Sequence, residues 1–163
     1  MPIRNLLFAA AVIASLWVSS SFAAEPTDES PQKFIQSWAE AFNKNDPEKL
    51  SAFYDQSDEL EVIVSAGVRH HGYKALQQAY VGDSRNVHFY DSQVSNLSTR
   101  VLGETALVTF EHQFKARFKT DNTRWQVHIR TTTVLHRMQG KWKIVLEHSS
   151  PIEGTPRFTQ IQE

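Results

Sequence analysis

Four long segments in the second half of the chain alternate apolar and polar side chains, and this pattern limits the possible folds more than any other feature. They run from 87 to 101, 105 to 119, 124 to 138 and 142 to 149, and they are rich in Val, Phe and Thr. A period of two residues predicts β-strands. The turns between the segments are only a few residues long, so consecutive strands must be antiparallel neighbours in a meander.

Short helices are predicted ahead of the meander. The first follows Pro31, where apolar residues recur at helical spacing, and the second begins at Pro47, with Asp46 as its cap. A short strand over 60–64 and a third helix over 73–80 come next. Helices followed by a curved meander are typical of an α+β fold in which the helices cover one face of the sheet.

The first 23 residues have the pattern of a secretory signal peptide. Arg4 precedes an apolar run over 6–18, and small residues lead up to Ala23. The apolar run is too short to span a membrane, which favours a signal peptide over a retained membrane anchor. We expect cleavage after Ala23, or one residue later, and a polar tail over 24–30. The mature protein is then expected to be secreted or periplasmic, with no membrane contact.

Charge and cysteine content narrow the classes of partner. The chain has 17 Lys and Arg, 18 Asp and Glu, 7 His and no Cys. The basic residues are scattered, so we expect no nucleic-acid partner. Without disulfides, stability must come from a hydrophobic core, which about 140 mature residues are long enough to form. The histidines do not follow an HExxH pattern and no cysteine ligands are present, so we expect neither a metal site nor a cofactor.

Two strands of the meander carry polar side chains in rows that are otherwise apolar. His112 shares its row with Phe110, and Thr131 and Thr133 interrupt the apolar row of the next strand. Side chains of one row face the same side of a sheet, so these polar groups are expected on the core face. The aromatic residues of the first two helices are further candidates, either as pocket walls or as plain core: Trp38, Phe42 and Tyr54.

Three stretches of the chain resemble a known family. They read DPEKLSAFY, SAGVRHHGYKAL and RTTTVLHRMQGKWKIVLEHSSP, and the resemblance runs from Gln32 to Ile152. The chain is similar to the SnoaL-like domains of the nuclear transport factor 2 superfamily, and its last strand is similar to that of the kinase association domain of calcium/calmodulin-dependent kinases. We place the SnoaL-like domain at 31–152 and a C-terminal tail at 153–163. The resemblance implies a cystatin-like cone, in which a curved antiparallel sheet wraps around three N-terminal helices.

The resemblance also implies a pocket at the open end of the cone and a convex face that pairs with a second subunit. We therefore expect a homodimer through the convex sheet face, because pairing would cover an apolar surface that soluble monomers avoid. The residues expected near the contact are Trp142, Ile144, His128 and Arg130.

The last strand, KWKIVLEHSSP, allows two arrangements. Simple alternation places four residues on the core face: Trp142, Ile144, Leu146 and His148. The resemblance instead implies that Val145, Glu147 and Ser149 face the pocket, and we favour this arrangement. A bulge near Glu147 would reconcile the two.

Catalysis can be considered from the same resemblance, since the family includes ketosteroid isomerases, dehydratases and polyketide cyclases. An isomerase of this type has a general-base Asp just before its glycine turn. This chain has Val64 and Ser65 there, and neither can take a proton from carbon at neutral pH, so ketosteroid isomerisation is not expected. His112 as a base, oriented by the carboxylate of Glu147, is a different catalytic pair.

Three functions of different kinds therefore remain open. The first is an exported module that binds a small, partly apolar molecule in its cone. The second is an isomerase, dehydratase or hydrolase that uses His112, and the third is an oligomerisation or assembly domain. The missing general base favours the first over the second, whereas the first and third both remain. The candidate ligand-binding residues are Trp38, Phe42, Tyr54, Phe110, His112, Thr131, Thr133, Glu147 and Ser149.

Overall fold

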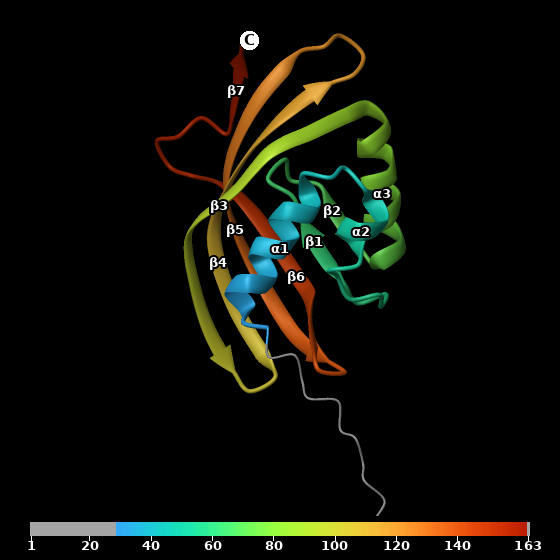
Figure 1. The fold of residues 1–163 in the computed structure, drawn as a ribbon, viewed down its shortest axis with the longest axis vertical. Coiled ribbons are helices and arrows are strands. Elements are labelled where there is room, and N and C mark those ends of the chain that lie inside the picture. Colours follow the sequence, from blue (N-terminus) through green and yellow to red (C-terminus); the bar gives the residue numbers. More distant parts are fainter. Residues whose placement is uncertain (1–28, 163) are drawn as a thin grey trace, which may run out of the picture.

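The computed structural model describes residues 29–162 (Figure 1). The predicted signal peptide and its cleavage site lie outside the described residues. Within them the helices are α1 (Pro31–Phe42), α2 (Pro47–Ser51) and α3 (Tyr73–Asn86). The strands are β1 (Glu61–Ile63), β2 (Arg69–His71), β3 (Val87–Leu102), β4 (Thr105–Phe118), β5 (Arg124–Met138), β6 (Lys141–Pro151) and β7 (Phe158–Ile161).

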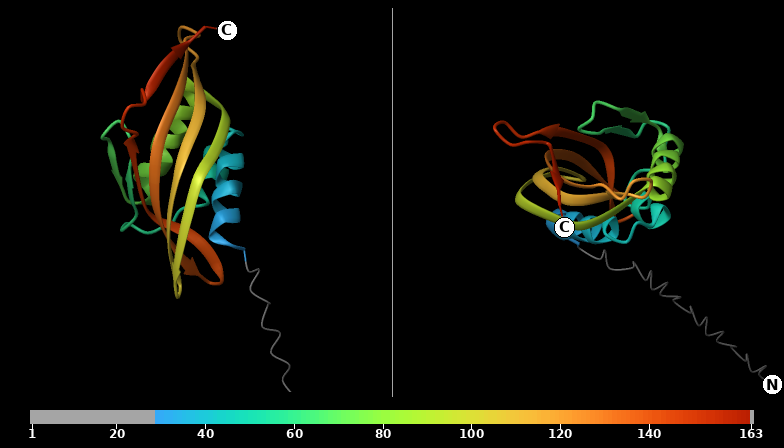
Figure 2. Two further views of the ribbon diagram at one scale, coloured as in Figure 1. Left: turned by 90° about the vertical axis from the view of Figure 1, so that its left-hand side faces the viewer. Right: turned by 90° about the horizontal axis from the view of Figure 1, so that it is seen from above.

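The strands form one curved sheet in the order β2-β1-β6-β5-β4-β3, and β7 pairs with β5 next to the end of β6. Strands β3 to β6 are the expected antiparallel meander, whereas β1 runs parallel to β6 and makes the sheet mixed. Figures 1 and 2 show α1 lying in the concave face, with α2 and α3 beside it. The predicted α+β cone is confirmed, with one parallel strand pair that was not expected.

The element boundaries differ from the predicted ones at four places. Helix α2 ends at Ser51, so Tyr54, which we expected on this helix, lies beyond its end and forms a β-bridge with Ile144. Helix α3 continues past Tyr80 to Asn86, and the side chains of Ser84 and Asn86 donate hydrogen bonds to carbonyls of the preceding turn at 2.9 Å each. Strand β2 lies between the predicted short strand and the third helix and was not predicted. Strand β7 lies in the segment 153–163, where we expected only a tail.

Two asparagine side chains fix the turn between α1 and α2 to β3. The Asn45 amide accepts a hydrogen bond from the backbone N–H of Phe89 at 2.7 Å and donates one to its carbonyl at 2.6 Å. Asn43 makes the same pair of bonds with Ser92, at 2.7 and 3.4 Å. These amides satisfy the backbone of β3 as a neighbouring strand would. The aromatic residues at the end of α1 are thereby held against β3 and β4.

Strand β6 contains one extra residue relative to β5. Val134 pairs with Leu146, but the next residue, Leu135, pairs with Ile144, so Val145 is a bulge. The bulge reverses the alternation. Ile144 is buried before it, and Glu147 is buried after it. The strand thus combines both arrangements that the sequence allowed.

The bulge also changes which residues of β6 can lie at a dimer contact on the convex face. Trp142 and Ile144 are 4% and 0% exposed and belong to the core, so the prediction that they lie near a contact on the convex face is wrong. The side chains that alternate with the buried ones along each strand face outward instead. Leu107, Val134 and Leu146 are register neighbours on three adjacent strands and form an outward apolar row.

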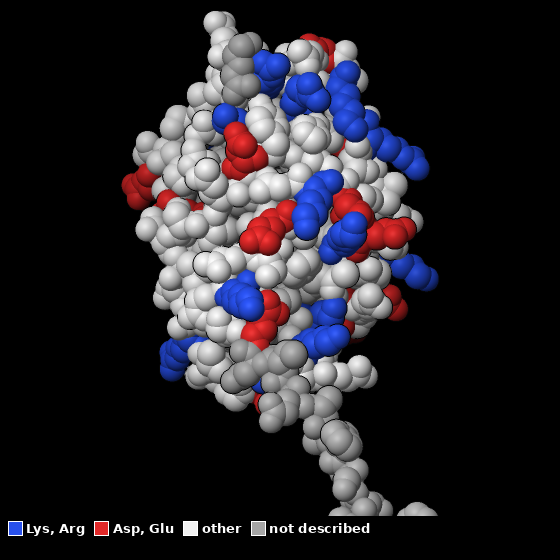
Figure 3. All heavy atoms as spheres, in the orientation of Figure 1, with Lys and Arg blue, Asp and Glu red and all other residues white. Residues whose placement is uncertain are grey.

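Charged side chains of both signs are mixed over the face seen in Figure 3. Charged side chains also form ion pairs elsewhere on the surface. Glu61 contacts Arg69 at 2.5 Å and His71 at 2.6 Å, and Glu111 contacts His128 at 3.1 Å. Exposed pairs of this kind contribute little to stability, so the core must hold the cone together.

Candidate functional site

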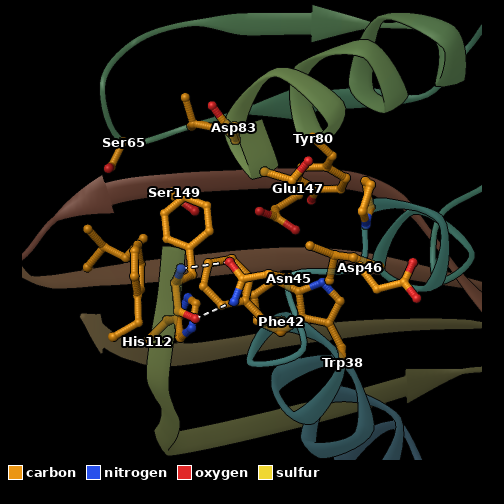
Figure 4. Close-up of a pocket in the computed structure, with 17 residues that line it drawn as sticks. Trp38, Phe42, Asn45, Asp46, Ser65, Tyr80, Asp83, His112, Glu147 and Ser149 are labelled. Atoms are coloured by element: carbon orange, nitrogen blue, oxygen red, sulfur yellow. Dashed lines mark hydrogen bonds between the residues drawn. The ribbon is translucent and has the colours of Figure 1, made fainter. Parts of the chain in front are cut away.

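A cavity of about 160 Å³ lies inside the cone, between α1, α3 and the concave face of the sheet (Figure 4). We refer to it as the inner chamber. Aromatic and aliphatic side chains form most of its wall, and a few polar groups face into it. Its lining residues are Trp38, Phe42, Asn45, Asp46, Pro47, Leu50, Val64, Ser65, Tyr80, Asp83, Ser84, Phe89, His112, Phe114, Ile129, Glu147 and Ser149.

A chain of hydrogen bonds holds Glu147 at the wall of this chamber. The hydroxyl of Tyr54 donates to Glu147 Oε2 at 2.7 Å. The same hydroxyl oxygen accepts hydrogen bonds from Trp38 Nε1 at 3.1 Å and from the hydroxyl of Tyr80 at 2.8 Å. Tyr54 is fully buried, so its three bonds come from protein groups and fix the orientation of one carboxylate oxygen.

Burial changes the acidity of Glu147. The side chain is 6% exposed, and loss of solvation raises its pKa to about 7, although the hydrogen bond from Tyr54 acts in the opposite direction. Its second oxygen, Oε1, has no hydrogen-bond partner among the described residues. Figure 4 shows the carboxyl group pointing into the chamber. Glu147 can therefore accept a hydrogen bond from a ligand or exchange a proton with it near neutral pH.

His112 lies in a box of aromatic rings. The centroid of its ring is 5.0 Å from Trp38, 5.1 Å from Phe42 and 4.7 Å from Phe114. Burial lowers the pKa of His112 to about 3, so the imidazole is neutral at physiological pH. Its Nε2 atom shares a hydrogen bond of 2.8 Å with Ser92 Oγ.

The structure does not join His112 and Glu147 directly. His112 bonds to Ser92, and Glu147 bonds to Tyr54. An imidazole with so low a pKa is a weak proton acceptor, so Glu147 is the better general base of the two. The carboxylate is not positioned to orient the imidazole, as the catalytic pair suggested by the sequence would require.

Five of the nine candidate ligand-binding residues line the chamber: Trp38, Phe42, His112, Glu147 and Ser149. The other four lie behind this lining. Tyr54 supports Glu147, Thr131 Oγ1 bonds Ser149 Oγ at 3.0 Å, and Phe110 packs in the core. Thr133 is also buried, and its hydroxyl oxygen has no hydrogen-bond partner in the described part of the chain.

The sequence reasoning missed several lining residues. Phe114 and Ile129 share the rows of His112 and Thr131, so the alternation itself could have identified them. Tyr80 and Asp83 are three residues apart on one face of α3, but the helix was predicted to end at Tyr80. Nothing in the sequence indicated that Asn45 lines the chamber. Its position depends on the turn between α1 and α2, which contacts β3, a strand far away in the sequence.

A second cavity of about 730 Å³ adjoins the first, and we call it the outer chamber. The two share five lining residues, Val64, Ser65, Asp83, Phe89 and Phe114, so they lie side by side. The remaining wall of the outer chamber comes from the turn between β1 and β2, from β3, β4 and β5, from the turn between β4 and β5, and from β7. It comprises Ala66, Val87, Ala116, Phe118, Asp121, Thr123, Trp125, Val127 and Phe158.

Metal binding has no support in residues 29–162, where no group of three or more His, Asp or Glu side chains is arranged to hold an ion. In the same range no helix is both long and apolar enough to cross a membrane.

Comparison with known families shows to which protein family the chain belongs. The sequence profile of the SnoaL-like domain matches residues 32–153, which is most of the chain and close to the extent of the resemblance. The chain belongs to the SnoaL-like domain family. Comparison of this SnoaL-like domain with curated proteins gives no match.

Solved structures share the fold of this SnoaL-like domain at low sequence identity. A nuclear transport factor 2 superfamily protein of Salmonella enterica is 18% identical, with a TM-score of 0.65 over 76% of this chain and 89% of that one. A provisionally named scytalone dehydratase of Novosphingobium aromaticivorans is 14% identical, with a TM-score of 0.67 over 77% and 92%. A provisionally named calcium/calmodulin-dependent kinase II association domain of Xanthomonas campestris is 16% identical, with a TM-score of 0.63 over 76% and 86%. These likenesses show the cone fold of the nuclear transport factor 2 superfamily.

Proposed function

We propose that this SnoaL-like domain binds a small, partly apolar molecule in the inner chamber, through a hydrogen bond to Glu147. The observation that carries the proposal is a buried carboxyl group whose second oxygen faces an aromatic-walled cavity without a protein partner. Burying such a group is costly unless its hydrogen-bonding capacity is used, and a ligand can use it. Pockets with apolar walls and a few polar groups are typical of small-molecule sites.

A second candidate is an acid–base enzyme that acts through Glu147. A pKa of about 7 lets this carboxyl group both accept and donate a proton at neutral pH. Among the similar structures, one is named as a scytalone dehydratase, and its reaction class requires proton transfer. In this candidate function the acid–base group is Glu147, whereas the sequence suggested His112. The substrate would bind in the inner chamber.

The binding proposal is tested by native mass spectrometry of protein purified from its own host. We expect the wild-type protein to retain a small molecule. Glu147→Ala should lower retention by about 5- to 150-fold, the equivalent of roughly 1 to 3 kcal/mol, because the donor group of the ligand loses its acceptor. Leu146→Ala is the matched control, since Leu146 is adjacent but faces outward. Wild-type protein with no added mass in any preparation would contradict the proposal.

The same spectra test the export proposal, which rests on the pattern of the first 23 residues. A secreted or periplasmic protein should have the mass of a chain that begins at Ala24 or Glu25. Exported material that still carries Met1 would rule out cleavage at this position.

We further propose that the domain forms a homodimer through the convex sheet face. Leu107 and Leu146 are 39% and 36% exposed, and they flank Val134 in the outward apolar row. His128 and Arg130 face the same side. The name of the Xanthomonas campestris neighbour, an association domain, supports assembly as one use of this fold.

Charging the outward row should separate the subunits. The double variant Leu107→Lys, Leu146→Lys should be monomeric in light scattering at micromolar concentration, because two ammonium groups cannot be buried at a sheet-to-sheet contact without partners. Val68→Lys is the control, since Val68 is 51% exposed and lies outside the row. A monomeric wild-type protein under these conditions would disprove the dimer.

A further inference from the structure

The two chambers lie side by side and differ in chemistry. The inner chamber is small, about 160 Å³, and contains Glu147. The outer chamber is about 730 Å³ and is lined mainly by Val, Ala, Phe and Trp side chains. A molecule that filled both would need a compact polar head and a longer apolar body.

The charged residues that line the chambers restrict which charge the polar head of a ligand can carry. Four acidic residues line the two chambers, Asp46, Asp83, Asp121 and Glu147, and neither lining contains a Lys or Arg. Two of the four are already used: Asp46 caps α2, and Asp121 accepts hydrogen bonds from Thr123. Asp83 at the junction of the chambers and Oε1 of Glu147 remain available to a ligand. A carboxylate or phosphate head in the inner chamber would meet like charge, whereas a cationic head would be attracted.

Aromatic rings add to this preference. Trp38, Phe42 and Tyr80 line the inner chamber together with Glu147 (Figure 4). The face of an aromatic ring attracts a cation, most strongly in a site that excludes water. Rings and a carboxylate that converge on one small space, with no Lys or Arg among its described lining residues, have the composition of an ammonium site.

We infer that the cone binds an amphiphilic amine, with its ammonium head beside Glu147 in the inner chamber and its apolar body in the outer chamber. This inference rests on the proposed function and specifies the ligand class. An ammonium group donates the hydrogen bond that Oε1 lacks and neutralises the buried carboxylate. The body then passes Asp83 and contacts the wall that β7 contributes.

The C-terminal segment sets the length of the body. Phe158 of β7 lines the outer chamber, and the Arg157 guanidinium donates a hydrogen bond to the carbonyl of Ser65, a residue that lines both chambers. The Arg157 guanidinium also lies 4.5 Å from the centroid of the Phe158 ring. These residues lie beyond the 32–153 range of the family match.

Isothermal titration calorimetry with matched ten-carbon probes tests the inference. We expect n-decylamine to bind at least about tenfold more tightly than n-decanoate. Glu147→Gln should reduce this ratio to about threefold or less, and Asp83→Asn, an exposed substitution, should reduce it to a smaller extent. Equal or tighter binding of decanoate would overturn the inference and leave the proposed binding function intact. If neither probe binds, the inference fails, and retention of a molecule in native mass spectra then decides whether the proposed function fails with it.

The length of the ligand is tested with n-butylamine, which is too short to fill both chambers. Wild-type protein should bind decylamine at least about tenfold more tightly than butylamine, because six further methylene groups are buried. Phe158→Ala should reduce this difference by about half or more. Leu102→Ala is the control, since Leu102 is also half-exposed but lines neither chamber. A Phe158→Ala protein with the wild-type ratio would show that the body does not reach β7.

Discussion

Glu147→Gln should make the protein more stable at pH 8 by about 3 kcal/mol and leave its stability almost unchanged at pH 4. Burial raises the pKa of Glu147 from 4.5 to about 7. A group whose folded-state pKa is raised contributes stability that is complete below the unfolded pKa and is lost as pH rises through the folded pKa. The loss therefore falls between pH 4.5 and 7, and a neutral amide avoids it.

The contribution of His112 to stability changes with pH in the opposite direction to that of Glu147. In the wild-type protein it therefore offsets the loss of stability caused by Glu147. Burial lowers its pKa from 6.5 to about 3, so the folded state is destabilised as pH falls from 6.5 to 3, where the unfolded chain takes up the proton first. Between pH 4.5 and 6.5 the two contributions have opposite slopes. We expect wild-type stability to vary little in that window, whereas Glu147→Gln should show a continuous rise from pH 3 to 6.5.

Urea unfolding at pH 4, 6 and 8, at one protein concentration, measures the difference between the two proteins. It should be close to zero at pH 4, about 2 kcal/mol at pH 6 and about 3 kcal/mol at pH 8. Ser149→Ala is the control, because it alters the neighbouring inward residue without a titrating group. Parallel profiles for wild type and Glu147→Gln would mean that Glu147 is ionised at no cost in the folded protein.

The sequence predicted the parts of the fold that depend on local patterns. The period of two residues located the meander strands, and Asp46 before Pro47 located the start of α2, where its carboxylate accepts two hydrogen bonds from backbone N–H groups at 3.1 Å. The inward row of His112 also followed from alternation. Each of these features is set by neighbours in the chain, so a single sequence contains the information.

The features that define the candidate site depend on distant residues. The bulge at Val145 exists because β6 pairs with β5 in a particular register, and nothing in WKIVLEH marks which residue is extra. Tyr54 and Glu147, which share the central hydrogen bond, are 93 residues apart. Alternation alone would have placed Glu147 on the surface. The inward position of Glu147 was predicted only from the resemblance to a family, because the alternation of apolar and polar residues does not indicate where a strand contains a bulge.

Tyr54→Phe is expected to destabilise the protein by roughly 2 to 4 kcal/mol, although the substitution conserves volume. The hydroxyl of Tyr54 accepts a hydrogen bond from Trp38 Nε1 and donates one to Glu147, and both partners are buried. Removing one oxygen leaves two buried groups unpaired. The loss should be larger at pH 8 than at pH 5.5, because the hydrogen bond from Tyr54 lowers the pKa of Glu147 and so favours its ionised form.

Tyr80→Phe separates the role of this hydroxyl from the general effect of losing a tyrosine oxygen in the chamber. Tyr80 donates only to Tyr54, at 2.8 Å, and it is partly exposed, so its removal should cost about 1 kcal/mol or less at either pH. In the double variant Tyr54→Phe, Glu147→Gln, the pH dependence of the Tyr54→Phe loss should disappear, since no carboxylate remains to need the donor. Equal losses for Tyr54→Phe and Tyr80→Phe, or a Tyr54→Phe loss that is independent of pH in the presence of Glu147, would show that Tyr54 does not hold the carboxylate. The polar end of the chamber would then have to be assigned to other residues.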